Sequence, residues 1–302
     1  MNANSSAIFI LGLMPRSGTN FLSNLLQLHP ECGPADPVWE DFLVSHLDQL
    51  AAYSDSVAGE WDAAWGVNEQ TATDLDIALG NGLADFLEDR CPGTRVVSKT
   101  PRVDNLGLFF RFFPRGKLLI LVRDGRSIVE SAARSFDWNR EAAMHSVSQA
   151  AKTIARFQEI HASENDHFRI LRYEDLWQDT ETQLHGLFKF LELDPGNYDW
   201  QQALALPVRG SSELKTAQEN TIHWDPIERN PEFDPMSRFA DWSDALHFRY
   251  NHVVGADMAP FGYRNKSVAG PAILLRLRNV LLDVTWGLKV LLRPLYHRLR
   301  RR

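Results

Sequence analysis

Residues 12–19 read Gly12-Leu-Met-Pro-Arg-Ser-Gly-Thr19 and directly follow the apolar run Ala7-Ile-Phe-Ile-Leu11. The apolar run predicts a buried strand over residues 7–13, and the pattern that follows the turn predicts a helix over 18–28. A turn that joins a strand to the start of a helix points backbone N–H groups and the positive end of the helix dipole at one place. The stretch therefore predicts an anion-binding turn at the carboxyl end of a strand.

The spacing of this turn is close to that of the nucleotide-binding loop GxxxxGK[ST], but the match is partial. Gly12 and Thr19 occupy the expected positions, whereas Ser17 and Gly18 stand where the second glycine and the lysine would be. The missing lysine is the residue that reaches the β- and γ-phosphates of a nucleoside triphosphate. A magnesium-dependent kinase or nucleotide hydrolase is therefore a disfavoured alternative.

Strands and helices alternate along the rest of the chain. This alternation predicts an α/β fold, a P-loop-like three-layer sandwich in which helices flank a central parallel sheet. Residues 195–240 are rich in Pro, Asn, Asp and Ser and predict a long loop. The other predicted strands are 94–98, 117–122 and 167–172, and the other predicted helices are 38–52, 73–90, 126–134, 140–163 and 180–191.

The composition is that of an ordinary globular protein of 302 residues, with 44% hydrophobic and 24% charged residues. The two cysteines, Cys32 and Cys91, cannot build a disulfide framework, and no Cys/His cluster indicates a metal site. The apolar run near the N-terminus is too short for a signal peptide and has no basic residues before it. We expect a cytoplasmic protein with one domain over residues 1–265 and a tail over 266–302.

Charge is distributed unevenly along the chain. Residues 271–302 contain eight Lys and Arg residues and one acid, Asp283, which is a net charge of +7. The whole chain has a net charge of −7, which leaves −14 on the first 270 residues. An acidic body gives no reason to expect nucleic-acid binding.

The tail, residues 271–302, has leucine and valine residues at helical spacing among its basic residues. This pattern predicts a basic amphipathic helix at the C-terminus of the fold. Such a helix either lies on an anionic membrane surface or packs as a dimer contact, and the sequence leaves both open. In the first case the cytoplasmic protein associates peripherally with a membrane.

Six further stretches of the sequence, taken together with the anion-binding turn, resemble the motifs of a known family. In their order and spacing, they and residues 12–19 resemble the motifs of sulfotransferases that use 3′-phosphoadenosine 5′-phosphosulfate (PAPS), over roughly residues 8–262. The similarity is closest to the branch of tyrosylprotein sulfotransferases and related bacterial sulfotransferases. It implies an enzyme that transfers a sulfuryl group from PAPS to an acceptor without a metal ion. The stretches are Leu28-His-Pro30, Ser98-Lys-Thr-Pro101, Leu121-Val-Arg-Asp-Gly-Arg126 with Ser131, Leu171-Arg-Tyr-Glu-Asp-Leu176, Phe188-Lys-Phe-Leu191 and Ser237-Arg-Phe239.

The resemblance also implies which residues bind the donor. Arg123 and Ser131 bind its 3′-phosphate, which suits an arginine at the carboxyl end of a strand in an α/β sheet. Tyr173 lies near the nucleotide. The 5′-phosphosulfate is held by Pro15, Arg16, Ser17, Gly18, Thr19 and Asn20, and the long loop contributes a lid or a 3′-phosphate contact through Arg209, Gly210 and Ser211.

Sulfuryl transfer needs groups that stabilise developing negative charge and a base that takes the acceptor's proton. The resemblance assigns the first role to Lys99, Arg16 and Ser237. For the base, an ungapped comparison with the related enzymes leads to Asp36, whereas Glu40 lies beside the apolar stripe of the predicted helix 38–52. We favour Glu40 and keep Asp36 as the alternative.

The acceptor is constrained by charge. Residues 17–89 contain fourteen Asp and Glu residues and no Lys or Arg. The overlapping stretch 34–93 is predicted to be a helical acidic insert that contributes to the acceptor site. Like charges disfavour an acidic peptide or a highly sulfated glycan, whereas Trp39, Trp61 and Trp65 suit a ring or an aliphatic chain. The predicted acceptor is a neutral or cationic carbohydrate, lipid or small molecule. Its accepting group is a hydroxyl in preference to an amine. A non-catalytic relative that binds the nucleotide without transfer is the second alternative.

Overall fold

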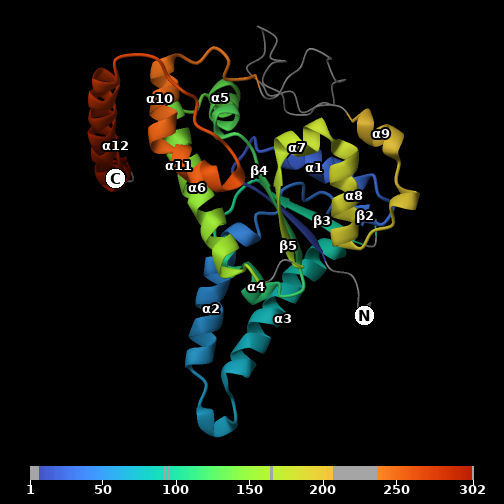
Figure 1. Cartoon of the computed structure of the whole chain (residues 1–302). Helices are drawn as coiled ribbons and strands as arrows, with labels where there is room; N and C mark the ends of the chain where they lie inside the picture. The colour runs from blue at the N-terminus through green and yellow to red at the C-terminus, as the bar shows by residue number, and fades with distance from the viewer. Residues whose placement is uncertain (1–6, 92, 94, 164–165, 207–236, 301–302) are drawn as a thin grey trace.

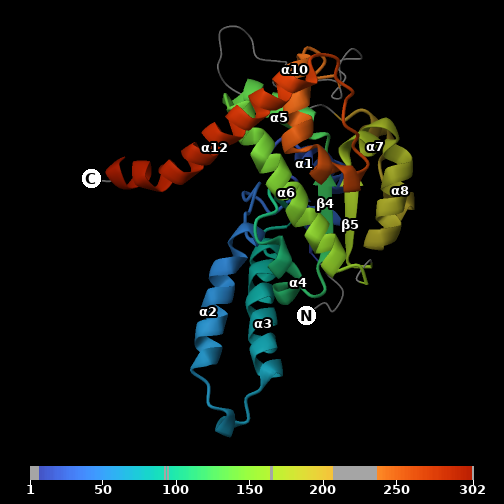
Figure 2. The same cartoon turned by 60° about the vertical axis from the view of Figure 1, so that its left-hand side comes forward.

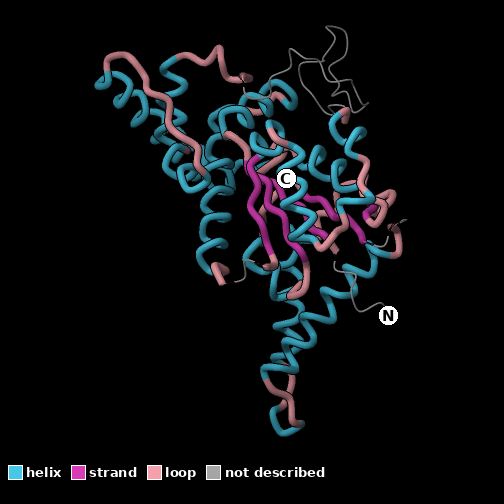
Figure 3. The backbone as a smooth tube through the Cα atoms, turned by 45° about the vertical axis from the view of Figure 1, so that its right-hand side comes forward, coloured by secondary structure: helices cyan, strands magenta, loops and turns pink. Residues whose placement is uncertain are grey.

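Figure 1 shows a computed structural model of the chain, which describes residues 7–91, 93, 95–163, 166–206 and 237–300, with side chains up to residue 292. At its centre lies a five-stranded sheet with the order β2-β3-β1-β4-β5, in which every neighbouring pair of strands is parallel. The predicted parallel sheet is therefore confirmed, and Figure 3 shows its strands side by side. The strands are β1 (Ile8–Gly12), β2 (Cys32–Gly33), β3 (Arg95–Thr100), β4 (Lys117–Val122) and β5 (Phe168–Arg172).

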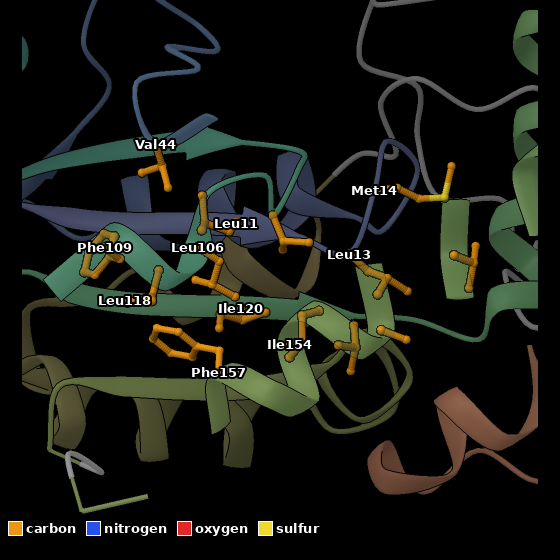
Figure 4. Close-up of a cluster of buried hydrophobic side chains, with 14 of the residues drawn as sticks. Leu11, Leu13, Met14, Val44, Leu106, Phe109, Leu118, Ile120, Ile154 and Phe157 are labelled. Carbon is orange, nitrogen blue, oxygen red and sulfur yellow. The ribbon is translucent and has the colours of Figure 1, made fainter. Parts of the chain in front are cut away.

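Side chains of the sheet alternate between two hydrophobic cores. In β1, Ile8 and Ile10 belong to one core, while Phe9 and Leu11 belong to the other. The strand reads as a continuous apolar run because both faces of the parallel sheet are covered. Figure 4 shows the second core, where Leu118 and Ile120 of β4 lie beside Phe109 and Phe157 from the covering helices.

Helices cover both faces of the sheet, which confirms the three-layer sandwich (Figures 1 and 3). The helices that pack on the Ile8 face are α1 (Thr19–Gln27), α7 (Tyr173–Gln178), α8 (Thr180–Leu191) and α9 (Trp200–Leu204). Those on the Phe9 face include α4 (Phe109–Phe112), α5 (Gly125–Phe136), α6 (Arg140–Ile160), α10 (Asp244–Val253) and α11 (Gly255–Met258). The sequence did not predict the short helices α7 and α9; the latter lies within the predicted loop 195–240.

A helical hairpin projects from the body on the side away from α10 (Figures 1 and 2). It consists of α2 (Leu47–Gly59) and α3 (Glu69–Glu88), joined by a turn that contains the 3₁₀ helix Ala63–Trp65. Arg111 of α4 braces its base, with Nη2 2.5 Å from Asp55 and Nε 2.7 Å from Asp76. Both helices of the hairpin lie within residues 34–93.

The helix predicted over 38–52 is wrong in its first part. Residues 38–43 form an irregular loop, a 3₁₀ turn follows at Val44–His46, and α2 begins only at Leu47. Asp41 and Phe42 of this loop form hydrogen bonds with β3, where a helix would have formed hydrogen bonds within itself. The carboxylate of Asp41 accepts hydrogen bonds from Ser98 Oγ at 2.7 Å and Lys99 N at 3.0 Å, and Phe42 N donates to Thr100 Oγ1 at 3.0 Å. Tertiary contacts override the helical periodicity here.

The C-terminal helix α12 (Ala272–Arg300) confirms the amphipathic helix predicted for the tail. It starts beside α10 and extends away from the body (Figure 2). None of the helices among the described residues is both long enough and apolar enough to cross a membrane.

Candidate active site

Four parallel strands end at one edge of the sheet, and the chain places a candidate residue at or just after each end. β1 leads into the turn that contains Arg16, and Lys99 lies one residue before the end of β3. Arg123 follows β4, and Tyr173 follows β5. Because carboxyl ends of parallel strands share an edge, residues up to 157 positions apart in the sequence meet there.

The turn after β1 is held by its own serine. Ser17, fully buried, donates from Oγ to Met14 O at 2.6 Å, and its Oγ accepts a hydrogen bond from Met14 N at 3.0 Å. Gly18 caps α1 with a φ of 98°, and a Cβ placed there would lie 2.3 Å from the ring of Tyr173. Only glycine suits both the left-handed backbone and this close ring.

Three guanidinium groups converge beside this turn. Arg16 Nε donates to Ser131 Oγ at 2.9 Å, and Arg238 Nη1 lies 3.4 Å from the same oxygen. Arg123 Nη1 donates to the carbonyl of Arg16 at 3.0 Å, and its guanidinium lies 4.3 Å from the centre of the Tyr173 ring. We name Arg16, Arg123, Ser131 and Arg238 the arginine cluster.

The cluster is electrostatically suited to an anion. Burial, and after it the charges of Arg238 and Arg123, lowers the pKa of Arg16 to about 10. Like charges therefore repel one another at a site that is partly withdrawn from water, and a bound anion relieves this repulsion. The N-terminus of α1 adds backbone N–H groups that have no partner within the helix. The cluster and the helix N-terminus together have the charge and the donors that a phosphate-bearing ligand requires.

A second group of side chains lies at the other side of the α1 N-terminus. Lys99 Nζ donates to Asn20 Oδ1 and lies 3.7 Å from Glu40 Oε1. The Lys99 side chain is 11% exposed and that of Glu40 is 32% exposed, so both are largely buried but still reach solvent. In such a pair the carboxylate is suited to take a proton, and the cation is suited to stabilise negative charge that develops on a ligand.

The other predicted site residues fall into three classes. Asp36 and Ser237 are exposed. Pro15 and Thr19 lie in the turn and at the first residue of α1, as the sequence predicts. Arg209, Gly210 and Ser211 lie outside the described residues.

Arg238 is the site residue that the sequence reasoning missed. It is 6% exposed and reaches Ser131 from the segment that follows residue 236. The signal was present, because Ser237-Arg-Phe239 resembles a Ser-Lys-Trp segment in which a cation occupies the middle position. The prediction instead fell on its neighbour Ser237.

The segment that carries Arg238 is tied to α5 through Glu130. This buried carboxylate receives Arg134 Nε at 2.7 Å, Arg140 Nε at 2.9 Å and Trp242 Nε1 at 2.9 Å. Burial alone would raise the pKa of Glu130, but the hydrogen bonds from Arg140, Trp242 and Arg134 outweigh it and lower the pKa to about 2. Glu130 therefore holds two parts of the arginine cluster, Ser131 and Arg238, in one place.

This brace predicts a pH-dependent contribution to stability. A carboxylate whose pKa is lowered on folding stabilises the protein above its unfolded pKa, and the contribution is lost as pH falls from about 4.5 to about 2. We expect Glu130→Gln to lower the free energy of unfolding at neutral pH by about 2–3 kcal/mol. Urea unfolding at a series of pH values measures this. The control Glu192→Gln removes an exposed carboxylate that pairs with Lys117, and should change stability by less than about 0.5 kcal/mol. Equal stability of Glu130→Gln and wild type would contradict the brace.

The structure limits how much of the predicted insert, residues 34–93, can belong to the site. The loop 38–46 contacts β3 at Lys99 through Asp41, whereas the turn between α2 and α3, with Trp61 and Trp65, lies at the far end of the hairpin (Figure 1). Trp39, next to Glu40, is 64% exposed. Among the described residues, no group of three or more His, Cys, Asp or Glu side chains is arranged to hold a metal ion.

Comparison with known proteins identifies relatives of the chain. The chain is 27% identical over 209 residues to protein-tyrosine sulfotransferase A of Caenorhabditis elegans, which covers 64% of this chain and 51% of that protein. It is 31% identical over 128 residues to protein-tyrosine sulfotransferase 1 of Homo sapiens, covering 41% of this chain and 33% of that protein. The chain thus spans about half or less of the length of these relatives.

A solved structure has the same fold. The sulfotransferase domain from the curacin biosynthetic pathway superimposes with a TM-score of 0.54 at 18% identity, covering 86% of this chain and 99% of that domain. A family profile described as "Sulfotransferase family" matches residues 7–196, which include the turn after β1, Lys99, Arg123, Ser131 and Tyr173. The chain belongs to the sulfotransferase family.

Proposed function

We propose that this protein is a sulfotransferase and that it uses PAPS as its donor. The observation that supports this most directly is the arginine cluster at the edge where β1 and β4 end, in which Arg16 and Arg238 reach Ser131 and Arg123 donates to the carbonyl of Arg16. The donor carries two separate phosphate-bearing ends, and the fold offers two adjacent anion sites. The arginine cluster suits the 3′-phosphate, and the N-terminus of α1 with Lys99 suits the 5′-phosphosulfate.

The proposed reaction is a direct in-line transfer. The acceptor oxygen forms a bond to sulfur while the bond between sulfur and the bridging oxygen of the 5′-phosphate breaks, and the nucleotide leaves with that electron pair. The acceptor's proton passes to the carboxylate of Glu40. Lys99, 3.7 Å from Glu40, stabilises the charge that develops on the bridging oxygen.

We further propose a hydroxyl acceptor that is neutral or cationic, such as a carbohydrate, a lipid or a small molecule. Glu40 and Asp41 are the charged residues of the loop beside Lys99, and they repel an acidic acceptor. The names of the relatives add tyrosine as a candidate hydroxyl. Tyrosine in a neutral or basic peptide satisfies both considerations, whereas tyrosine in an acidic peptide does not.

A ligand screen tests the donor. The nucleotide product of transfer, 3′-phosphoadenosine 5′-phosphate (PAP), should raise the thermal unfolding midpoint, because a ligand that binds only the folded state stabilises it. Magnesium with ATP should raise it less. Preferential stabilisation by ATP would point to a kinase or hydrolase and reject the proposal. Transfer of label from PAPS to an acceptor panel then separates an enzyme from a non-catalytic relative, which would bind PAP without any transfer.

Arg238→Ala tests the arginine cluster. We expect this change to weaken PAP binding about 10- to 100-fold, because it removes a buried cation beside Ser131. Isothermal titration calorimetry measures the affinity. Arg156→Ala, an exposed arginine on α6, is the matched control and should bind PAP as wild type does. Unchanged affinity in Arg238→Ala would remove Arg238 from the donor site.

A further inference from the structure

The C-terminal helix α12 presents an apolar face that the rest of the structure leaves uncovered. Leu277, Leu281 and Leu288 are 62%, 64% and 53% exposed. Successive residues of a helix advance by about 100°, so these leucines, with Val284 and Leu291, lie within an arc of about 80°. We name this arc the outer face of α12.

The opposite side of α12 fixes the direction of the outer face. Asp283 accepts from Arg249 Nη1 at 2.8 Å and lies 2.9 Å from His252 Nε2, both on α10. The ring of Trp286 stacks on His145 of α6, with ring centres 4.3 Å apart and an interplanar angle of 3°. Arg249 is only 2% exposed, so this attachment is anchored in the body of the protein. The helix is held in one rotation, with its leucines pointing outward.

Cations flank the outer face. Arg278 and Lys289 lie about 60–80° beyond one border of the arc, and Arg276 lies about 60° beyond the other. Asp283, the acid of the tail, faces the body, where Arg249 and His252 bind it. An apolar stripe with cations on both sides suits a membrane surface. The stripe would contact the acyl chains, and the cations would contact the anionic headgroups above them.

We propose that α12 docks the protein on an anionic lipid bilayer, lying in the plane of its surface. A second copy of the chain fits this face less well, because it would set the flanking cations against those of its partner. The helix extends beyond the acidic body (Figure 2), so its cations can reach the surface ahead of the body's negative charge. This inference does not depend on the donor or the acceptor.

Co-sedimentation of the full chain with lipid vesicles tests the inference. We expect binding to vesicles of phosphatidylcholine with phosphatidylserine, weaker binding to phosphatidylcholine alone, and a loss of binding at high salt. The double change Leu281→Asp with Leu288→Asp should lower the bound-to-free ratio by at least about tenfold. Both leucines are exposed, so the thermal unfolding midpoint should stay that of wild type.

The matched control adds the same two charges elsewhere. Ser56→Asp with Asn81→Asp alters exposed positions on the α2–α3 hairpin and should bind vesicles as wild type does. Wild-type protein that stays in the supernatant, or equal binding by the two double variants, would overturn the inference. So would a wild-type dimer, measured by light scattering, that the leucine changes convert to a monomer, because a second copy would then cover the face.

Discussion

Glu40→Gln is expected to lower kcat by about 10²- to 10⁴-fold while PAP binding changes by less than about threefold. The change keeps the shape of the side chain beside Lys99 and removes its capacity to take a proton. Steady-state transfer from labelled PAPS measures kcat, and titration calorimetry measures PAP binding. The loss should depend on the acceptor: a phenol that is already ionised at the assay pH needs no base, so its rate should fall much less than that of an alkyl alcohol.

This acceptor dependence separates a base from a structural carboxylate, which would affect all acceptors alike. Asp36→Asn is the matched control, because the sequence left Asp36 as the alternative base and this residue is exposed in the structure. It should keep the wild-type kcat within about threefold. If Asp36→Asn lost activity and Glu40→Gln kept it, the assignment of the base would be reversed.

Lys99→Met is expected to lower kcat by about 10²- to 10³-fold. Methionine keeps much of the length and apolar character of the side chain but removes the cation that contacts Asn20 and Glu40. Because this cation acts on charge that grows during transfer, kcat should fall more than PAP affinity does. Single-turnover transfer with enzyme in excess measures the chemical step directly.

Lys152→Met gives the corresponding control. Lys152 lies on α6 with a side chain that is 61% exposed, and its contact is an ion pair with Asp257 at 3.4 Å. Its replacement should leave kcat unchanged. A Lys99→Met enzyme that transfers at the wild-type rate would show that the positive charge at residue 99 plays no part in the reaction.

The sequence was sufficient for the features of the site that depend on local order. Arg16 and Arg123 each follow a predicted strand, and parallel strands bring such residues together whatever the details of packing. The same argument placed Lys99 at the edge. Because these positions need only the strands and their direction, the fold and most of the arginine cluster could be predicted.

Features that depend on tertiary contacts could not be predicted. The apolar spacing of residues 38–52 is typical of a helix, but Asp41 and Phe42 bind β3, and their contacts fix a loop that brings Glu40 to Lys99. Glu40 was thus favoured for a reason that does not hold, since it lies on no helix. Arg238 comes from a region without periodicity, and only the folded chain shows that it meets Ser131.

The distances along the chain between members of the arginine cluster have a consequence for how the protein is made. Arg16 and Ser131 are separated by 115 residues, and Ser131 and Arg238 by 107. Such non-local contacts close large loops and form late in folding. During synthesis, which runs from the N-terminus, the cluster stays incomplete until residue 238 has left the ribosome. A nascent chain that has already paired β1 with β4 still lacks Arg238 of the arginine cluster. An anion that needs all three guanidinium groups therefore binds only late in folding and cannot stabilise its early steps.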